Sequence, residues 1–153
     1  MSGLVNIGGS PDDATYRYKM PRLRIKIEGS GNGIKTVIPN MSDVAKALKC
    51  SPAYPTKFFG VELGAQSNYD KATDRAVVNG AFTAKDLSGL LTKFIDIFVL
   101  CPNCRLPEIT LKVKRDIIKV ECAACGHNGV LPTTHKLVTY IINNPPTVKK
   151  KLG

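Results

Sequence analysis

The clearest pattern of hydrophobic positions in the chain is helical and lies just past its middle. After Thr83, apolar residues recur at intervals of three or four up to residue 98. This period places them on one face of an amphipathic helix, and a threonine directly before the pattern is a typical N-cap. We therefore predict a helix that packs into a core rather than around a cofactor. Its apolar face is formed by Leu87, Leu90, Leu91, Phe94, Ile95 and Phe98.

An alternation of apolar and polar residues with a period of two predicts strands in the first half of the chain. Residues 22–28 alternate in this way, the glycine-rich residues 29–33 predict a turn, and residues 34–38 predict the returning strand. A further short strand is expected over 75–79, whereas the polar residues 65–75 are expected to form a loop. The half-buried face of the first strand would carry Leu23, Ile25 and Ile27.

Three shorter segments complete the predicted elements. Asn40 is the predicted cap of a short helix, and Cys50 near its end is interpreted as a small core residue. Pro55 suits the first turn of a second helix, which Gly64 would end. Residues 135–142 are expected to form a last short helix or strand.

Four of the five cysteines fall in two Cys-x-x-Cys pairs, which are separated by 17 residues. Each pair lets two thiolates reach one ion from a tight turn, and this separation is typical of a structural zinc site. Gly126, directly after the last cysteine, suits a knuckle, and residues 108–121 alternate like a two-stranded hairpin. The layout is that of a zinc ribbon. The predicted zinc ligands are Cys101, Cys104, Cys122 and Cys125.

Disulfides and a redox-active dithiol are two other interpretations of these cysteines. The first 20 residues lack the apolar run of a secretory signal peptide, so an oxidising compartment is not expected. A redox dithiol needs only one pair, usually at the start of a helix. His127 and His135 could replace a ligand, but four cysteines already complete the set. Because four thiolates leave no open coordination position, the zinc is expected to be structural and not catalytic.

The chain length suits one ordinary domain, or a small domain joined to a metal-stapled one. We predict an α+β fold with a flexible tail over residues 1–19, an α/β domain over 20–99 and a zinc ribbon with a C-terminal segment over 100–146. Residues 147–153 are expected to begin a linker. The ribbon should be braced against the first domain, because the long helix runs almost directly into it. No apolar run approaches the roughly 20 residues that cross a bilayer, and we expect a cytoplasmic monomer.

The net charge of +10 is high for 153 residues and indicates a polyanionic partner, such as RNA or an acidic protein. A basic but inert surface is the alternative. Between residues 14 and 27 there are five basic residues and no acidic one. We expect RNA contacts from the basic strand over 22–26 and from the loop over 66–75. The candidate residues are Arg22, Arg24, Lys26, Lys71 and Arg75.

Residues 29–36 nearly spell a phosphate-binding P-loop, but the pattern requires a glycine directly before the lysine, and Ile34 stands there. A P-loop joins a strand to a helix, whereas this loop is predicted to join two strands. We therefore predict that the chain does not hydrolyse a nucleotide by itself. The loop could approach a phosphate held by another molecule, and an ordinary hairpin turn is the alternative. Its residues are Gly29, Ser30, Gly31, Asn32, Gly33, Ile34, Lys35 and Thr36.

Several segments between about residues 16 and 146 together resemble one family. They are Tyr16-Arg-Tyr-Lys-Met-Pro-Arg-Leu23, Gly31-Asn-Gly-Ile-Lys-Thr-Val37, Asp43-Val-Ala-Lys-Ala-Leu48, Tyr54-Pro-Thr-Lys-Phe-Phe-Gly60 and Glu62-Leu-Gly-Ala-Gln66. The cysteine quartet and His135-Lys-Leu137 add to them. On these residues the chain resembles the N-terminal region of eukaryotic translation initiation factor five.

The resemblance implies an α/β domain similar to that of initiation factor one, followed by a zinc ribbon. It implies that the chain stimulates GTP hydrolysis by initiation factor two in the ribosomal preinitiation complex and helps start-codon selection. By the same resemblance, Arg17 would be an arginine finger supplied in trans, and Lys35 and Lys57 would assist it. GTP would be held only by the partner, so the chain would be a GTPase-activating protein rather than an enzyme.

The implied partners are the gamma subunit of initiation factor two with its GTP, the beta subunit, small ribosomal subunit RNA and the initiator transfer RNA. The family also has a C-terminal helical-repeat domain that is missing from this sequence, so a fragment is expected. Two rival interpretations remain. The chain could be the beta subunit of initiation factor two, which is not expected to show the Tyr16-Arg-Tyr segment with its glycine loop. It could also be a basic zinc-ribbon module that binds RNA by itself, with a steep salt dependence.

Overall fold

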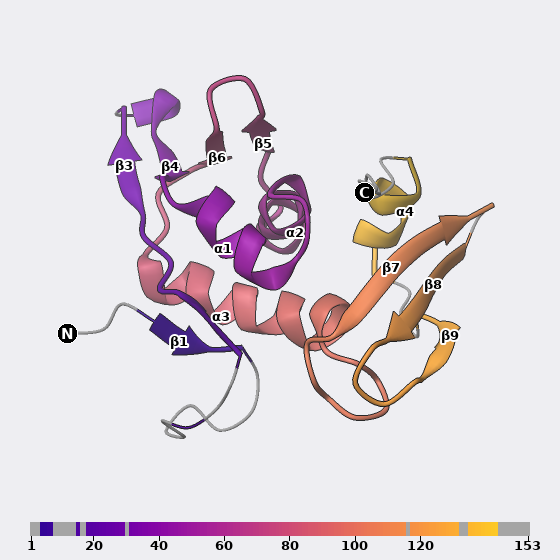
Figure 1. Cartoon of the computed structure of the whole chain (residues 1–153). Coiled ribbons are helices and arrows are strands. Elements are labelled where there is room, and N and C mark those ends of the chain that lie inside the picture. The colour runs from indigo at the N-terminus through magenta and orange to yellow at the C-terminus, as the bar shows by residue number, and fades with distance from the viewer. Residues whose placement is uncertain are drawn as a thin grey trace.

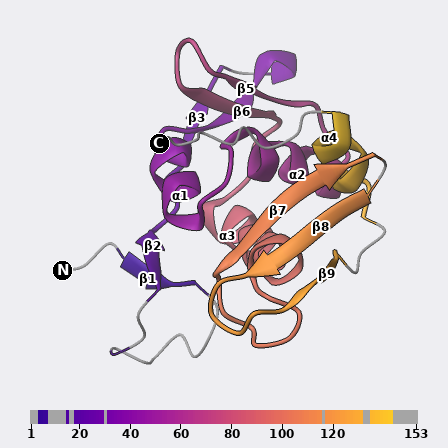
Figure 2. The same cartoon turned by 45° about the vertical axis from the view of Figure 1, so that its right-hand side comes forward.

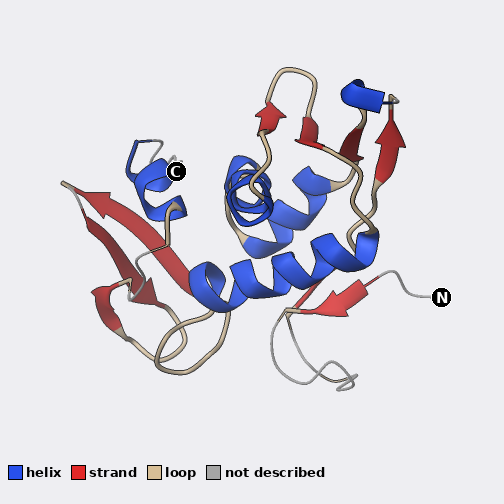
Figure 3. Ribbon diagram, turned by 180° about the vertical axis from the view of Figure 1, so that it is seen from behind, coloured by secondary structure: helices blue, strands red, loops and turns tan. Residues whose placement is uncertain are grey.

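Helix α3 (Ala84–Phe94) lies along the middle of the molecule, and the other elements pack around it (Figure 1). The computed structural model describes residues 4–7, 15, 18–29, 31–115, 117–131 and 135–143. Their helices and antiparallel sheets form an α+β fold, as predicted. Seen from behind, the four-stranded sheet and the ribbon lie at opposite ends of α3 (Figure 3).

The start of α3 follows the predicted chemistry. The Thr83 hydroxyl accepts a hydrogen bond from the Asp86 amide at 3.0 Å, and the Asp86 carboxylate accepts one from the Thr83 amide at 3.3 Å. This capping box satisfies two amides that the first turn would otherwise leave without partners. A π-helical turn, η2 (Ile95–Val99), continues the helix almost to Cys101. The predicted apolar face is confirmed as core, with Leu87 and Phe94 almost fully buried.

The four-stranded sheet has the order β3-β4-β6-β5, and all neighbouring strands are antiparallel. Its strands are β3 (Lys26–Glu28), β4 (Lys35–Ile38), β5 (Ser67–Asp70) and β6 (Arg75–Asn79). A short 3-10 helix, η1 (Gly31–Gly33), lies in the turn between β3 and β4. The face that carries Ile38, Ala76 and Val78 is fully buried.

Two predictions about this sheet are wrong. The first strand begins at Lys26 and not at residue 22, because the Asn40 side chain binds the backbone of the preceding segment. The Asn40 amide donates to the Arg22 carbonyl at 2.8 Å and its carbonyl accepts from the Arg24 amide at 3.0 Å. Asn40 therefore occupies the N-cap position of α1 without capping it through its side chain.

The second error concerns residues 65–75, for which the sequence predicts a loop but which contain β5. Its sequence is polar because β5 is an edge strand that needs few inward-facing apolar side chains. Tyr69 packs against the core. Ser67 lies close to α2, because a Cβ added at Gly60 would approach the Ser67 hydroxyl to 2.2 Å.

Helices α1 (Met41–Leu48) and α2 (Ala53–Leu63) connect β4 to β5, and α2 packs against β5, β6 and α3. Helix α2 begins at Ala53, so Pro55 lies in its first turn, as predicted. Proline is tolerated there because the first turn has no intrahelical acceptor for its amides. Gly64 ends α2 in a left-handed conformation, as expected.

The ribbon is a three-stranded antiparallel sheet of β7 (Ile109–Lys114), β8 (Ile117–Cys122) and β9 (Asn128–Val130), in that order. The predicted hairpin between the cysteine pairs is confirmed, whereas β9 was not predicted. The last segment is a helix, α4 (Leu137–Asn143), which contacts α2 and β8.

One hydrophobic core joins the ribbon to the helices. Ile118 and Val120 of β8 belong to the same buried cluster as Phe58, Phe94 and Phe98. The expected bracing of the ribbon is therefore confirmed. The predicted division between residues 99 and 100 stays a prediction, and residues 147–153 lie outside the described part of the chain.

Part of the predicted flexible tail is ordered. Strand β1 (Leu4–Asn6) pairs antiparallel with β2 (Lys19–Pro21), and Ile7 is buried in the core. The Ile7 amide also donates to the Tyr18 carbonyl at 2.8 Å. Val5 and Ile7 of this segment pack with the core, so residues 4–7 are part of the fold, while a flexible tail over 1–19 stays a prediction. Arg17 lies outside the described residues.

Candidate functional site

The two Cys-x-x-Cys segments fold into equivalent knuckles. In the first, the Arg105 amide donates to the Cys101 carbonyl at 2.9 Å, and in the second the Gly126 amide donates to the Cys122 carbonyl at 3.0 Å. Both donors follow the second cysteine of their pair, and both have positive φ, 63° for Arg105 and 79° for Gly126. The glycine adopts this conformation at no steric cost. The repeated geometry aims all four thiols at one point.

The sulfur atoms are arranged as a tetrahedral metal would require. All four lie within 4.8 Å of one another, with 3.7 Å between Cys101 Sγ and Cys125 Sγ and 3.6 Å between Cys104 Sγ and Cys122 Sγ. Tetrahedral zinc with bonds of about 2.3 Å places its sulfurs about 3.8 Å apart. None of the five cysteines forms a disulfide. The four thiols could therefore bind a structural metal such as zinc.

Hydrogen bonds favour the thiolate form at Cys125. At Cys104 a hydrogen bond from the Leu106 backbone is outweighed by burial and by the neighbouring cysteines, which raise the pKa of that thiol to about 12. The Asn103 amide nitrogen donates to Cys101 Sγ at 3.3 Å, and its side-chain amide donates to Cys125 Sγ at 3.5 Å. The bond from the Asn103 side chain, followed by one from the His127 backbone, lowers the pKa of the Cys125 thiol to about 6. A metal binds the deprotonated sulfur, so these donors favour metal binding.

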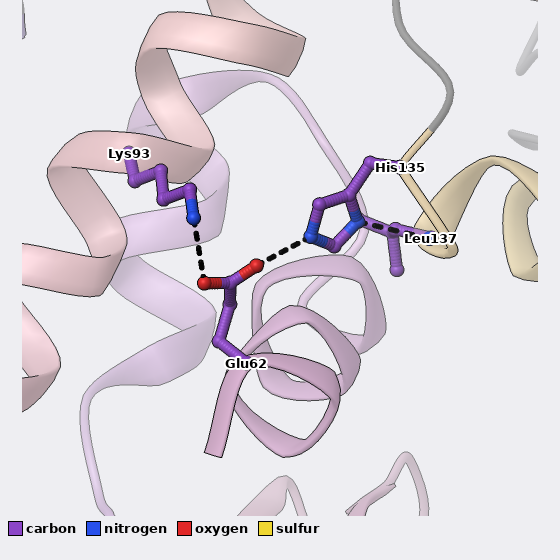
Figure 4. Close-up of polar contacts among 4 residues, drawn as sticks. All are labelled: Glu62, Lys93, His135 and Leu137. Carbon is purple, nitrogen blue, oxygen red and sulfur yellow. Dashed lines mark hydrogen bonds and ion pairs between the residues drawn. The ribbon is translucent and has the colours of Figure 1, made fainter. Parts of the chain in front are cut away.

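Neither histidine belongs to the cysteine cluster. His135 lies instead between α2 and α4, where its Nε2 meets Glu62 Oε2 at 2.6 Å and its Nδ1 accepts from the Leu137 amide at 3.0 Å (Figure 4). The other oxygen of Glu62 accepts from Lys93 Nζ of α3 at 2.7 Å. The His135 ring stacks on Phe58, with 4.6 Å between ring centroids. His135 thus fastens α4 to α2.

The glycine-rich loop joins two strands, which agrees with the rejection of a P-loop. Gly29 has φ of 78°, and a Cβ there would approach the Gly33 carbonyl oxygen to 2.4 Å, so the turn requires glycine. Thr36 is fully buried, donating to the Gly80 carbonyl at 2.8 Å and accepting from the Phe82 amide at 3.0 Å. Thr36 is therefore a structural residue beneath the loop. Gly29, Gly31 and Gly33 of the loop are exposed, and Ile34 and Lys35 are half-buried.

Each of the two lysines predicted to assist catalysis lies near Asn79. Lys35 on β4 is directly opposite Asn79 on β6, so the two side chains share one face of the sheet. Lys57 of α2 lines a groove of about 350 Å³ whose wall includes Asn79. Lys57 Nζ also lies 5.8 Å from the centroid of the Tyr140 ring on α4. The other residues of the groove are Gln66, Ser67, Asn68 and Val77.

The residues predicted to contact RNA are largely accessible. Arg22, Arg24, Lys26 and Lys71 are exposed. Arg75 is half-buried and forms an ion pair with Glu28 across the sheet, which holds the pKa of the Glu28 carboxyl below its usual value. Arg75 is therefore partly neutralised, and its assignment as an RNA contact stays a prediction, as do the other four.

Residues next to Arg17 are anchored to the start of the ribbon. The Tyr18 hydroxyl donates to Glu108 Oε2 at 2.7 Å, and Lys49 Nζ lies 3.3 Å from Glu108 Oε1. The Glu108 carbonyl accepts from the Ala123 amide of the second knuckle at 3.0 Å. Sequence reasoning missed Glu108, Glu62 and the role of His135, since their partners lie far away in the chain.

Comparison with known proteins places this architecture in a family. Residues 10–128 match the model of a family described as a domain found in initiation factors 2B and 5. The chain is 56% identical over 144 residues to eukaryotic translation initiation factor 5 of Mus musculus, covering 93% of this chain and 34% of that protein. It is 53% identical over 148 residues to probable eukaryotic translation initiation factor 5 of Schizosaccharomyces pombe, covering 95% and 38%.

A plant relative matches equally broadly. The chain is 51% identical over 149 residues to eukaryotic translation initiation factor 5 of Phaseolus vulgaris, covering 96% of this chain and 34% of that protein. The chain thus spans little more than a third of the length of these curated relatives. Within the part that the structure describes, no helix has the length and apolar character needed to cross a membrane.

Proposed function

The chain belongs to the family that carries the domain found in initiation factors 2B and 5, within which it matches the N-terminal region of eukaryotic translation initiation factor 5, and we propose that it acts in translation initiation as a GTPase-activating module. Its target is initiation factor two, whose gamma subunit holds the GTP, in a cytoplasmic ribosomal preinitiation complex. By stimulating hydrolysis there, it contributes to start-codon selection.

The observation that supports this function best is the placement of Lys35 and Lys57. Lys35 of β4 is the cross-strand neighbour of Asn79, and Lys57 of α2, 22 positions further along the chain, lines a groove to which Asn79 also belongs. Ammonium groups at these two places would suit a polyanionic triphosphate presented by a partner. The chain has no P-loop of its own, so its role is to complete a site on another protein.

Arg17 supplies the catalytic charge in this proposal. Phosphoryl transfer spreads negative charge over the oxygens of the moving group, and an arginine supplied in trans increases the rate by about 10³ to 10⁵ in known GTPases. Guanidinium suits this task because it is always charged and presents a planar fork of donors. Tyr18 directly follows Arg17 in the chain, and its hydrogen bond to Glu108 holds it against the body of the protein.

Single-turnover GTP hydrolysis in the ternary complex of initiation factor two, with the small ribosomal subunit, tests the assignment. Arg17→Ala should lower the stimulated rate by about 10³-fold or more without changing the binding of the chain to the complex. Arg17→Lys should also be slow, because an ammonium lacks the fork. Lys85→Ala is the control, since Lys85 is an exposed cation of α3 to which the proposal gives no role. Equal rates for Arg17→Ala and the control would refute the finger assignment.

Zinc has a structural role in this proposal. Cys101, Cys104, Cys122 and Cys125 would hold the ion in a closed set of four sulfurs, so it binds no substrate. The ion fixes both knuckles and hence the end of the ribbon that Glu108 joins to Tyr18. The other proposed partners are the beta subunit, small ribosomal subunit RNA and the initiator transfer RNA.

A second candidate function is that of the beta subunit of initiation factor two. The matched family model is not restricted to initiation factor 5, because its description also names IF2B, so membership of the family does not by itself separate the two candidates. Such a subunit would form a stoichiometric complex with the gamma subunit that survives high salt. Size-exclusion chromatography of the mixture in high salt separates the two candidates, because a GTPase activator should elute apart from the gamma subunit.

A further inference from the structure

The ribbon has an outer face on which basic side chains are concentrated. The pairing register places Lys112 opposite Lys119, and Lys114 opposite Ile117, on adjacent positions of β7 and β8. Ile118 and Val120 alternate with these residues and are buried against the helices. Because side chains alternate between the two faces of a sheet, the lysines point away from the core. Figure 2 shows the ribbon in front, with α3 behind it.

Two like charges on this face are close enough to lower the stability of the sheet. Lys112 and Lys119 are direct cross-strand neighbours, and like charges in such positions repel. Glu121 forms an ion pair with Lys112 at 3.2 Å. Among the residues that the structure describes, Lys114, Arg115 and Lys119 have no ion-pair partner. The repulsion would be relieved by an anion bound across the two strands.

Apolar side chains are exposed between these charges. Ile117 is 42% exposed and Val130 is 52% exposed, and they are two of the three large hydrophobic residues that are exposed in the described part of the chain. Ile117 lies opposite Lys114, and Val130 lies opposite Lys119. Each aliphatic group therefore stands beside an ammonium group.

We propose that this outer ribbon face, Lys112, Lys114, Arg115, Ile117, Lys119 and Val130, binds RNA through its sugar-phosphate backbone. The lysines and the arginine would contact phosphates, while Ile117 and Val130 contact the less polar sugars. Contacts to phosphates do not distinguish one base from another, so we expect binding that is independent of RNA sequence. The four-stranded sheet, in which β6 begins with Arg75 and the turn before it contains Lys71, lies toward the other end of α3 (Figure 3), so the outer ribbon face is a second RNA surface.

RNA fits this face better than an acidic protein does. Lysine is depleted in protein–protein interfaces, whereas interfaces with nucleic acids are strongly positive and polar. Residues 109–122 carry four basic and two acidic residues, and one of the acids, Asp116, lies outside the described part. The described face thus has four basic groups and the single acid Glu121, which already pairs with Lys112.

The zinc-loaded chain can be tested directly with a short RNA of mixed sequence, by fluorescence anisotropy over a range of salt concentrations. The triple variant Lys112→Gln/Lys114→Gln/Lys119→Gln should bind about tenfold more weakly, and the slope of log affinity against log salt should fall by about 2. The control triple variant Lys46→Gln/Lys85→Gln/Lys136→Gln removes the same charge from exposed helical or helix-flanking positions. It should retain most of the affinity and the slope.

The thermal midpoint of the ribbon variant shows whether a loss of RNA binding comes from unfolding. Removing the Lys112–Lys119 repulsion should leave the thermal midpoint of the ribbon variant unchanged or higher. Equal RNA affinity and salt slope for the ribbon variant and the wild type would overturn the proposal. The same holds if the control variant loses as much RNA affinity as the ribbon variant. If the ribbon variant kept its RNA affinity but lost binding to a polyglutamate peptide, the face would take an acidic protein instead of RNA. None of these outcomes depends on the GTPase assay.

Discussion

The Tyr18 hydroxyl donates to Glu108 Oε2 at 2.7 Å, across 90 positions of sequence. Glu108 is bound through both its side chain and its backbone. Its other carboxylate oxygen lies 3.3 Å from Lys49 Nζ, and its carbonyl accepts from the Ala123 amide, inside the second cysteine knuckle. A short path of hydrogen bonds therefore connects the metal-binding knuckle to the residue that follows Arg17.

Tyr18→Phe should slow stimulated GTP hydrolysis about tenfold, because it removes a hydrogen bond to a charged group, typically about 1.5–3 kcal/mol. The fold should persist, since the tyrosine ring keeps its packing against the core. Single-turnover hydrolysis in the partner complex measures the effect. Glu108→Gln combined with Tyr18→Phe should be no slower than the slower single variant, because both remove one interaction. Fully additive losses would show that the two residues act separately.

Removal of the metal should loosen both the ribbon and the segment around Tyr18. Chelation leaves four clustered thiols without their common ligand, and metal binding is coupled to folding in small sites of this kind. Hydrogen exchange should therefore speed up over residues 101–131 and over 18–21. Unchanged protection of both segments after chelation would refute the structural role of the metal.

Cys50→Ala is the matched cysteine control for that experiment. Cys50 does not belong to the group of four cysteines whose sulfurs could hold a metal, and burial raises the pKa of its thiol to about 12. Cys50→Ala should keep the full metal content, measured by mass spectrometry, whereas Cys101→Ser should lower it.

The sequence predicted those elements whose pattern is local. Thr83 and the spacing of Leu87, Leu91 and Phe94 predicted α3, and the two cysteine pairs predicted both knuckles and the hairpin between them. Each signal lies within one element or one turn, where periodicity and spacing carry the information.

Long-range side-chain contacts account for what the sequence could not predict. Asn40 looks like a helix cap, but its side chain binds the backbone at Arg22 and Arg24, which shortens β3. His135 looks like a spare metal ligand, but it meets Glu62, 73 positions away. Nothing local distinguishes a histidine that binds a carboxylate on another helix from one that binds zinc. Within the candidate site, the spacing predicted the four sulfurs, whereas only the fold shows that Lys35 is the cross-strand neighbour of Asn79 and that Lys57 lines a groove with it.

Glu62 should make the stability of the protein depend on pH in the acid range. Hydrogen bonds from Lys93 and then His135 lower the pKa of the Glu62 carboxyl below its usual value of 4.5. A lowered pKa in the folded state means that the stabilisation is complete above about pH 4.5 and is lost as the pH falls through the folded value. Urea unfolding at pH 7 and below pH 4 should show this loss in the wild type, while Glu62→Gln should show less of it.

The size of the Glu62 effect can be compared with that of an exposed acid. Glu62→Gln should lower the free energy of unfolding at pH 7 by about 1–3 kcal/mol, because Lys93 and His135 lose a charged partner. Glu121→Gln, which removes one exposed ion pair with Lys112, should cost about 1 kcal/mol or less. Equal effects of both substitutions would contradict a special role of the Glu62 contacts.

The contact between Lys57 and Tyr140 should affect the rate rather than the fold. Helix α4 holds the Tyr140 ring 5.8 Å from Lys57 Nζ, which restricts an otherwise mobile side chain. A cation–π contact at an exposed site contributes about 0.5–1 kcal/mol, so Tyr140→Leu should slow stimulated hydrolysis about two- to fivefold. Tyr140→Phe keeps the ring and should keep most of the rate. In a Lys57→Met background Tyr140→Leu should have no further effect, and a further loss there would show that α4 acts by another route.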